Sequence, residues 1–124
     1  MAGDLTPHFS VAEFRCRCGC GLGAIDLDFV RRLERARCVA GVPFHITSGV
    51  RCPAHNRQVK EAGAKSAHVQ GRAADIFVLN NQTRWAILCG VFTAGFRRVE
   101  IGPVHIHVDT ADDADHRQDV CWLA

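Results

Sequence analysis

The chain has 124 residues, of which 48% are hydrophobic and 23% charged, and its formal net charge is +2 at pH 7. This length suits one domain with one core, and the composition excludes an intrinsically disordered chain. The cations are spread along the chain and no apolar stretch approaches the roughly 18 residues of a membrane span, so we expect neither nucleic-acid binding nor membrane insertion.

The sequence starts without the basic and then apolar pattern of an export signal. We therefore expect synthesis in the cytoplasm, a single domain over residues 1–124 and a monomer. The seven cysteines are an odd number, and reduced thiols are the default expectation for such a chain.

Three of the cysteines alternate with other residues between Cys16 and Cys20, inside a cysteine- and glycine-rich segment, residues 1–25. This is not the two-residue spacing of a zinc ribbon or finger. Two interpretations stay open: a structural metal site completed by Cys52, or a glycine-rich turn that buries its small thiols as hydrophobic side chains.

Capping residues define the first two predicted helices. Ser10 and Glu13 form a capping box, in which the hydroxyl and the carboxylate satisfy free amides at the start of a short helix. Asp26 is the predicted N-cap of a longer helix with apolar residues at three- to four-residue spacing, and Gly41 ends it. We expect the longer helix to pack against the core.

Strands and helices alternate from residue 44 onward. Residues 44–47 alternate apolar and polar side chains, as a half-buried strand does. Pro53 suits the first turn of a helix that we expect to end at Gly63. Residues 73–79 are an apolar run typical of a buried strand.

The last third of the chain begins with a helix that Asn80 caps and that runs to Ala94. Residues 96–101 and 104–109 flank a Gly-Pro turn, which predicts a hairpin. We expect residues 111–124 to be an acidic, solvated tail. The apolar face of the helix is predicted to hold four residues: Trp85, Leu88, Cys89 and Phe92.

Titratable side chains gather on the second strand of this hairpin. His105, His107 and Asp109 alternate with apolar residues and therefore project from one face. A single histidine on a strand is more often an ordinary surface residue than a ligand. Two histidines at i and i+2, however, can both turn toward one metal, or one can bind it while the other acts on the bound water.

A carboxylate inside an apolar strand is the second anomaly. Asp75 costs several kcal/mol if it is buried without a partner, so it needs a cation, a metal or amide donors. A salt bridge to an arginine such as Arg72 is one solution. His68, which precedes Asp75 by seven residues across a glycine, can also fold back toward it. Two histidines and one carboxylate are the ligand set of a catalytic zinc, here His68, Asp75 and either His105 or His107.

Residues 66–75 match the pattern Ser-x-His-x-x-Gly-x-Ala-x-Asp of the D-alanyl-D-alanine carboxypeptidase-like zinc peptidases, which cleave bacterial cell-wall peptides. Residues 46–56 resemble that family's Thr-Ser-Gly-Tyr-Arg segment and the His-Asn that follows it, and residues 105–109 resemble its closing strand. The similarity runs from Phe9 to Thr110 and is greatest to small phage endolysins. It implies an α+β domain of the hedgehog and D-Ala-D-Ala peptidase type, in which an antiparallel sheet carries the zinc ligands and helices pack on one side.

The resemblance also implies site residues. It makes His68, Asp75 and His107 the ligands of a Zn²⁺ ion. Arg51 corresponds to the arginine of the family's active cleft, which is thought to stabilise the oxyanion or bind a substrate carboxylate; a guanidinium suits both roles. The structural alternative for Arg51 is an ion pair with Asp75 or Asp109.

One position departs from the pattern. Several members place a glutamate or aspartate three residues before the last zinc histidine as general base, and here that residue is Val104. His105 is the first candidate for the base, because it shares the face of His107 and because the wider lysostaphin-like group uses the first histidine of a His-x-His motif in catalysis. Glu100 and Asp109 are the other candidates, and Asp109 is equally suited to orient a histidine ring.

The sequence therefore predicts zinc-dependent hydrolysis of peptide bonds in the peptidoglycan stem, either as a D,D-carboxypeptidase or as an endopeptidase such as one acting between L-Ala and D-Glu. We expect action at the cell wall, as a phage or prophage lysis enzyme after holin-type release or as a bacterial housekeeping peptidase. The main alternative is a catalytically silent, zinc-stabilised binding or tail-assembly protein of a phage. A nucleic-acid-binding zinc module built on the cysteines is a weaker one.

Overall fold

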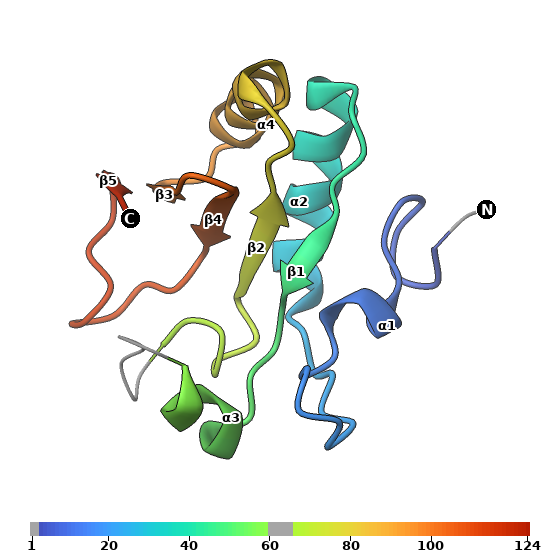
Figure 1. Ribbon diagram of the computed structural model, residues 1–124, viewed down its shortest axis with the longest axis vertical. Helices are drawn as coiled ribbons and strands as arrows, with labels where there is room; N and C mark the ends of the chain where they lie inside the picture. Colours follow the sequence, from blue (N-terminus) through green and yellow to red (C-terminus); the bar gives the residue numbers. More distant parts are fainter. Residues whose placement is uncertain (1–2, 60–65) are drawn as a thin grey trace.

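A computed structural model describes residues 3–59 and 66–124, and its centre is a five-stranded sheet with two long helices against one face (Figure 1). This is the predicted α+β class. The elements in chain order are α1 (Val11–Phe14), α2 (Leu27–Ala40), β1 (Ile46–Ser48), α3 (Pro53–Gln58), β2 (Ala73–Phe77), α4 (Asn81–Thr93), β3 (Arg98–Ile101), β4 (His105–Asp109) and β5 (Val120–Leu123).

The predicted helix caps are confirmed. The Glu13 carboxylate accepts a hydrogen bond from the backbone N–H of Ser10 at 2.7 Å, as the capping box requires. Asp26 accepts from the third amide of α2, and Gly41 ends that helix in the left-handed conformation. Helix α3 ends at Gln58, and the predicted stop at Gly63 lies outside the described residues. None of the described helices combines the length and apolarity needed to cross a membrane.

The buried face of α4 differs from the predicted one. Trp85 is 73% exposed and Phe92 is 49% exposed, whereas Ile87 and Val91 are fully buried. Of the predicted face, Leu88 does pack against the core. The prediction was wrong because α4 carries apolar residues around most of its circumference, so the face that packs is chosen by the fit to α2 and not by hydrophobicity alone.

Gly90 allows the close crossing of α4 and α2. A Cβ atom at this position would lie 2.3 Å from the carbonyl oxygen of Ala36 and 3.0 Å from the Cβ of Ala40. We expect Gly90→Ala to lower the free energy of unfolding by about 1–3 kcal/mol, because the helices must separate. Alanine is the better helix former by about 1 kcal/mol, so packing and propensity oppose each other here. Urea denaturation measures the change, with exposed Thr93→Ala as control; an unchanged stability would contradict the close crossing.

The sheet is mixed and not purely antiparallel, which corrects the prediction. Its strand order is β1-β2-β4-β3-β5, with β3 and β5 parallel and every other neighbouring pair antiparallel. The predicted hairpin of β3 and β4 is present. The parallel strand comes from the segment that we expected to be a solvated tail: residues 111–119 carry exposed aspartates, but residues 120–123 are apolar and add a strand at the sheet edge.

The two faces of the sheet have different roles. One face packs against α2, whose buried residues lie along one side of that helix, as predicted. Alternation sends the remaining strand residues to the opposite face, which no helix covers in Figure 1. The strand residues in the core are Ile46, Ala74, Ile76, Val99, Ile106 and Val108.

A partly buried carboxylate ties the N-terminal segment to α2. Glu34 accepts a hydrogen bond from the backbone N–H of His8 at 2.8 Å and also pairs with the His8 ring. Burial opposes ionisation, but the hydrogen bonds with His8 outweigh it and lower the pKa of Glu34 from 4.5 to about 2.

This pair predicts an acid-sensitive contribution to stability. Because the pKa of Glu34 is lower in the folded chain, its contribution is complete above pH 4.5 and is lost as the pH falls toward 2. We expect Glu34→Gln to cost about 1 kcal/mol at pH 6, after allowance for solvent screening, and nothing near pH 2. Urea denaturation at several pH values measures this difference, with Asp28→Asn on the exposed side of α2 as control. A cost that is independent of pH would refute it.

Candidate metal centre

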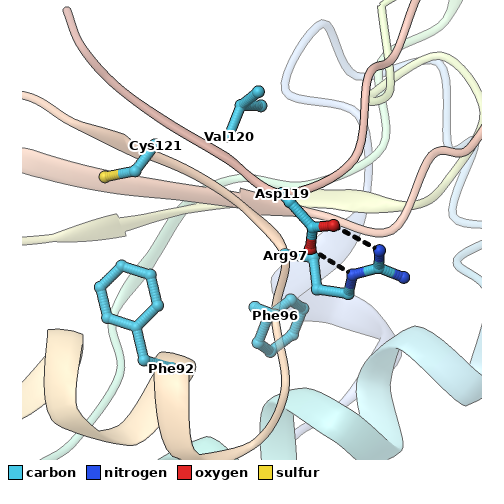
Figure 2. A pocket seen from close by; sticks show the side chains of 6 residues that line it. All are labelled: Phe92, Phe96, Arg97, Asp119, Val120 and Cys121. Atoms are coloured by element: carbon cyan, nitrogen blue, oxygen red, sulfur yellow. Dashed lines mark hydrogen bonds and ion pairs between the residues drawn. The ribbon is translucent and has the colours of Figure 1, made fainter.

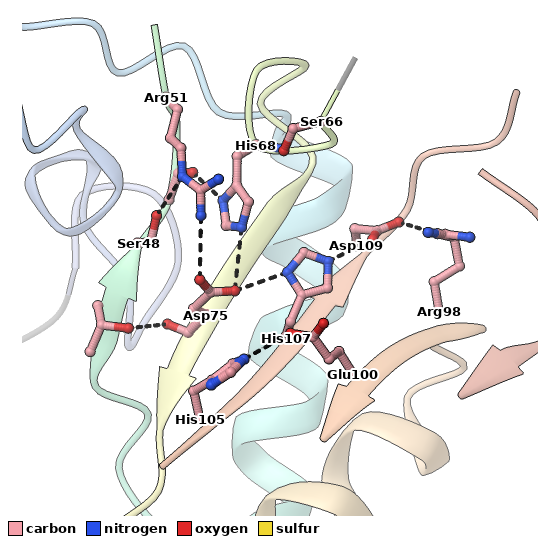
Figure 3. Close-up of polar contacts among 12 residues, drawn as sticks. Ser48, Arg51, Ser66, His68, Asp75, Arg98, Glu100, His105, His107 and Asp109 are labelled. Atoms are coloured by element: carbon pink, nitrogen blue, oxygen red, sulfur yellow. Dashed lines mark hydrogen bonds and ion pairs between the residues drawn. The ribbon is translucent and has the colours of Figure 1, made fainter. Parts of the chain in front are cut away.

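A row of side chains crosses the uncovered face of the sheet (Figure 3). Residues that lie directly opposite each other on neighbouring strands project to the same face. Asp75 is opposite His107, and Glu100 is opposite His107 on its other side. The row continues to Ser48 on β1 and Trp122 on β5. Strand register therefore places a carboxylate, an imidazole and a second carboxylate side by side.

The turn before β2 brings His68 to this row. The Ser66 hydroxyl accepts a hydrogen bond from the backbone N–H of His68 at 3.2 Å. Gly71 has φ +70°, and a Cβ there would lie 2.4 Å from the carbonyl oxygen of Ala24, so the glycine of the sequence pattern is needed for both reasons. The ring Nδ1–H of His68 donates to the Gly49 carbonyl at 2.7 Å. Since a carbonyl only accepts, Nδ1 carries the proton of a neutral His68 ring, and Nε2, which faces Asp75, is the nitrogen that can bind a metal.

His68, Asp75 and His107 converge as the resemblance implies. Asp75 Oδ1 lies 3.3 Å from His68 Nε2 and 2.9 Å from His107 Nδ1, and the three ligand atoms all lie within 4.8 Å of one another. Two ligands at zinc–ligand bond lengths on a tetrahedral ion are about 3.3 Å apart. The donor set and its spacing thus fit a zinc ion.

Hydrogen bonds between carboxylates and imidazoles favour the charged forms of Asp75 and His107. Burial disfavours the charged form of Asp75, but hydrogen bonds from His107 and His68 outweigh burial and hold its pKa far below the usual value. Burial also disfavours protonation of His107, yet hydrogen bonds to Asp109 and Asp75 raise its pKa to about 9. Both ring nitrogens of His107 therefore carry protons at neutral pH, and a metal that binds Nδ1 displaces one of them.

Asp109 holds the far side of the His107 ring. Its Oδ2 lies 2.7 Å from His107 Nε2, and its Oδ1 accepts from Arg98 Nε at 2.7 Å. The Asp109 side chain is only 1% exposed. Of its two predicted roles, this position suits the orientation of a histidine ring, because it directs Nδ1 of His107 toward Asp75.

Arg51 reaches the cluster from the segment after β1. Its Nη2 lies 3.6 Å from Asp75 Oδ2, while its other nitrogens donate to Ser48 Oγ and Asn56 Oδ1, each at 3.3 Å. Arg51 thus occupies the cleft position that the resemblance implies and also forms the ion pair with Asp75 that was the structural alternative. Arg72, the partner suggested by spacing, is exposed.

Two candidates for the general base, His105 and Glu100, lie beside the three metal-ligating side chains. His105 Nε2 is 2.8 Å from Glu100 Oε1, and Trp122 Nε1–H donates to Glu100 Oε2 at 2.7 Å. Both His105 and Glu100 keep part of their surface exposed. Of the two histidines that spacing left open as ligands, His107 joins the cluster and His105 pairs with Glu100. Val104 is exposed in the turn before β4.

Sequence reasoning missed two residues that complete the site. The ring centroids of Trp122 and His107 are 5.9 Å apart. The Cζ atom of Arg98, whose guanidinium also pairs with Asp109, lies 5.1 Å from the centroid of the Trp122 ring. Arg98 gave no signal of the kind that Asp75 gave, because residues 96–101 also carry Arg97 and Glu100. Trp122 lies in the segment interpreted as a solvated tail.

A hollow elsewhere on the molecule contributes nothing to this centre (Figure 2). It is bounded on one side by the bidentate ion pair of Arg97 and Asp119, whose bonds are 2.6 and 2.7 Å long. None of its lining residues is a predicted site residue. The lining consists of Phe92, Phe96, Arg97, Asp119, Val120 and Cys121.

Comparison with known families agrees with the geometry. Residues 7–109 match the family model described as Peptidase M15, whereas a comparison with curated proteins finds no match. The matched region ends at Asp109, so it contains the three clustered residues and stops before β5. The match and the metal cluster together show that this chain belongs to the peptidase M15 family of zinc-dependent metallopeptidases.

Proposed function

We propose that the chain hydrolyses peptide bonds in the peptide stem of peptidoglycan. The observation that carries the proposal is the convergence of two imidazoles and one carboxylate at 2.9–3.3 Å on an uncovered sheet face, beside a guanidinium. Three protein ligands leave a fourth position for water or substrate, which is the arrangement of catalytic and not of structural zinc.

His68, Asp75 and His107 would hold the ion. When bound, zinc supplies a Lewis acid that polarises a scissile carbonyl and activates water at neutral pH. Gly49 and Asp109 fix the two imidazole rings, so the chain sets the direction of both ligand atoms before the metal arrives. Asp75 stays ionised and so contributes negative charge over the whole physiological pH range.

Glu100 and His105 form the pair that moves the proton. They share one hydrogen bond on the exposed side of the row, and Trp122 holds the second oxygen of Glu100. Either partner can accept a proton from water and pass it to the leaving amine, while the other stabilises the charge that results. This pair takes over the role of the carboxylate that several family members carry at the position of Val104.

Arg51 supplies the anion-binding group. Its guanidinium is held by Ser48 and Asn56, so its remaining donor edge is already oriented toward the cluster. There it can stabilise negative charge on the carbonyl oxygen in the transition state or bind the terminal carboxylate of a stem peptide. The first use suits an endopeptidase as well as a carboxypeptidase, whereas the second suits only a carboxypeptidase.

We further propose a role in lysis, as a phage or prophage enzyme that acts at the cell wall. The support is the similarity of residues 9–110 to small phage endolysins. Loss of turbidity in permeabilised bacterial cells after addition of the protein tests this setting separately from the chemistry.

Digestion of purified peptidoglycan tests the activity and identifies the bond. We expect new peptide termini, found by mass spectrometry of the released fragments, which disappear on chelation and return with zinc. His68→Ala should lower the rate by at least about a thousandfold, because a ligand of the activating metal is lost. A folded, zinc-loaded wild type that leaves peptidoglycan intact would refute the proposal and favour a zinc-stabilised binding or tail-assembly protein.

A further inference from the structure

A second group of metal-ligating side chains lies outside the catalytic cluster. The thiols of Cys16, Cys18, Cys20 and Cys52 all lie within 4.8 Å of one another. Three of them come from the loop that follows α1, and Cys52 comes from the N-cap of α3, 32 residues after Cys20. The catalytic centre uses none of these thiols. Four thiols from two distant segments are more than a glycine-rich turn requires to bury its cysteines.

The spacing of the sulfur atoms suits a shared ion. Cys18 Sγ lies 3.4 Å from Cys16 Sγ and 3.6 Å from Cys52 Sγ. Ligand sulfurs on a tetrahedral zinc are about 3.8 Å apart, given zinc–sulfur bonds of about 2.3 Å. A disulfide bond is only about 2.05 Å long, so these contacts are between free thiols, in agreement with the unpaired state of all seven cysteines.

Backbone amides in this region are aimed at sulfur. The N–H of Cys52 points to Cys16 Sγ and the N–H of His55 points to Cys52 Sγ, each at 3.3 Å. Amide donors stabilise thiolates, which are the form that binds metal. Donors directed at two different members of one group indicate that the local backbone is built to hold negative charge on sulfur.

We propose that Cys16, Cys18, Cys20 and Cys52 bind a structural zinc ion. Four thiolates form a closed tetrahedral set with no open position, which is the usual composition of structural sites and differs from the open set at His68. The ion joins the N-terminal loop to the first turn of α3. The one-residue spacing between the first three cysteines differs from a zinc ribbon, but the glycines between and after Cys18 and Cys20 turn the chain enough to bring all three thiols to one point.

This site would also brace the catalytic centre. Cys52 follows Arg51 directly, and the same segment contributes the Gly49 carbonyl that fixes His68. Val50 N–H donates to the carbonyl of Phe14 at 2.8 Å, so a backbone hydrogen bond already joins this segment to the end of α1, directly before the cysteine loop. Metal at the thiols would limit the motion of Arg51 relative to Asp75, and its loss would affect turnover only indirectly.

Metal counting on the full chain, expressed and purified under reducing conditions with zinc, tests the proposal. We expect two zinc ions per wild-type chain, one in Cys18→Ser/Cys20→Ser, and one in His68→Ala/His107→Ala. Cobalt substitution should give a thiolate charge-transfer absorption that the histidine variant keeps and the cysteine variant loses. A thiol-specific mercurial should release one of the two ions from wild type, which provides a readout that needs no folded variant.

A matched control uses the remaining cysteines. Cys38→Ser/Cys89→Ser/Cys121→Ser leaves only the four clustered thiols and should still bind two ions with the same absorption. The proposal is overturned if wild type and Cys18→Ser/Cys20→Ser bind the same amount of zinc. It is also overturned if, in protein purified without reductant and then denatured, only the three cysteines outside the cluster titrate as free thiols, since that result means the cluster is oxidised to two disulfides. Neither result depends on whether the chain cleaves peptidoglycan.

Discussion

Asp75→Asn is expected to abolish peptide hydrolysis, with kcat/KM lowered by at least about a thousandfold, and to weaken zinc binding at the catalytic centre by more than about a hundredfold. Asp75 is the one carboxylate among the three clustered residues, and it contacts His68, His107 and Arg51. Asparagine keeps the size of the side chain but loses its charge, so it neither balances the ion nor holds Arg51 in place.

Isothermal titration with zinc and digestion of purified peptidoglycan measure the two effects. Asp113→Asn is the matched control, because Asp113 pairs with His116 at 2.7 Å on the surface and lies outside the centre. That variant should bind zinc and digest peptidoglycan as wild type does. If Asp75→Asn kept wild-type affinity at this centre, Asp75 would be an ion-pair partner of Arg51 and not a ligand.

Asp109→Asn is expected to lower both stability and zinc affinity, although Asp109 is not one of the three clustered ligands. Its carboxylate is buried between Arg98 and His107. Loss of the charge leaves the Arg98 guanidinium buried without its anionic partner, which costs roughly 3–5 kcal/mol. It also removes the acceptor that sets the direction of the His107 ring, so zinc affinity should fall about 10- to 100-fold.

Chemical denaturation of the metal-free protein and zinc titration separate these two effects. Asp119→Asn supplies the control, because Asp119 makes an equally short pair with Arg97 that is exposed to solvent. Exposed pairs contribute little to stability, so that variant should unfold as wild type does. Equal stability of the two variants would mean that burial of the Asp109 pair has no energetic consequence.

The convergence of His68, Asp75 and His107 could be anticipated because two of these residues break local sequence patterns. Asp75 is a charged residue in a buried strand. His107 lies between Ile106 and Val108, which enter the core, so its ring projects to the opposite face. Each of the two polar side chains therefore needs a partner from elsewhere in the chain. The identity of the zinc ligands among the candidates came from family resemblance. Spacing alone left His105 and His107 equivalent. The structure distinguishes them, because His107 lies 2.9 Å from Asp75 whereas His105 pairs with Glu100.

Features that depend on tertiary packing were not predictable in the same way. The exposed position of Trp85 follows from the close approach of α4 to α2 at Gly90, which periodicity does not report. The parallel pairing of β5 with β3 joins segments that are far apart in the sequence, so local patterns do not predict it. The acidic residues before β5 also led us to interpret a short apolar strand as part of a solvated tail. Trp122 was therefore missed as a neighbour of His107.

The polar row across five strands makes the centre depend on the alignment of neighbouring strands. Side chains alternate between faces with a period of two, so one inserted residue within β4 would exchange His107 for an aliphatic neighbour and turn the imidazole into the core. An insertion in the connection before β4 leaves that parity untouched. The centre can therefore tolerate insertions and deletions in the connections, whereas a one-residue change within a strand would disrupt it. Chains that share this centre should differ in the length of their connections and not of their strands.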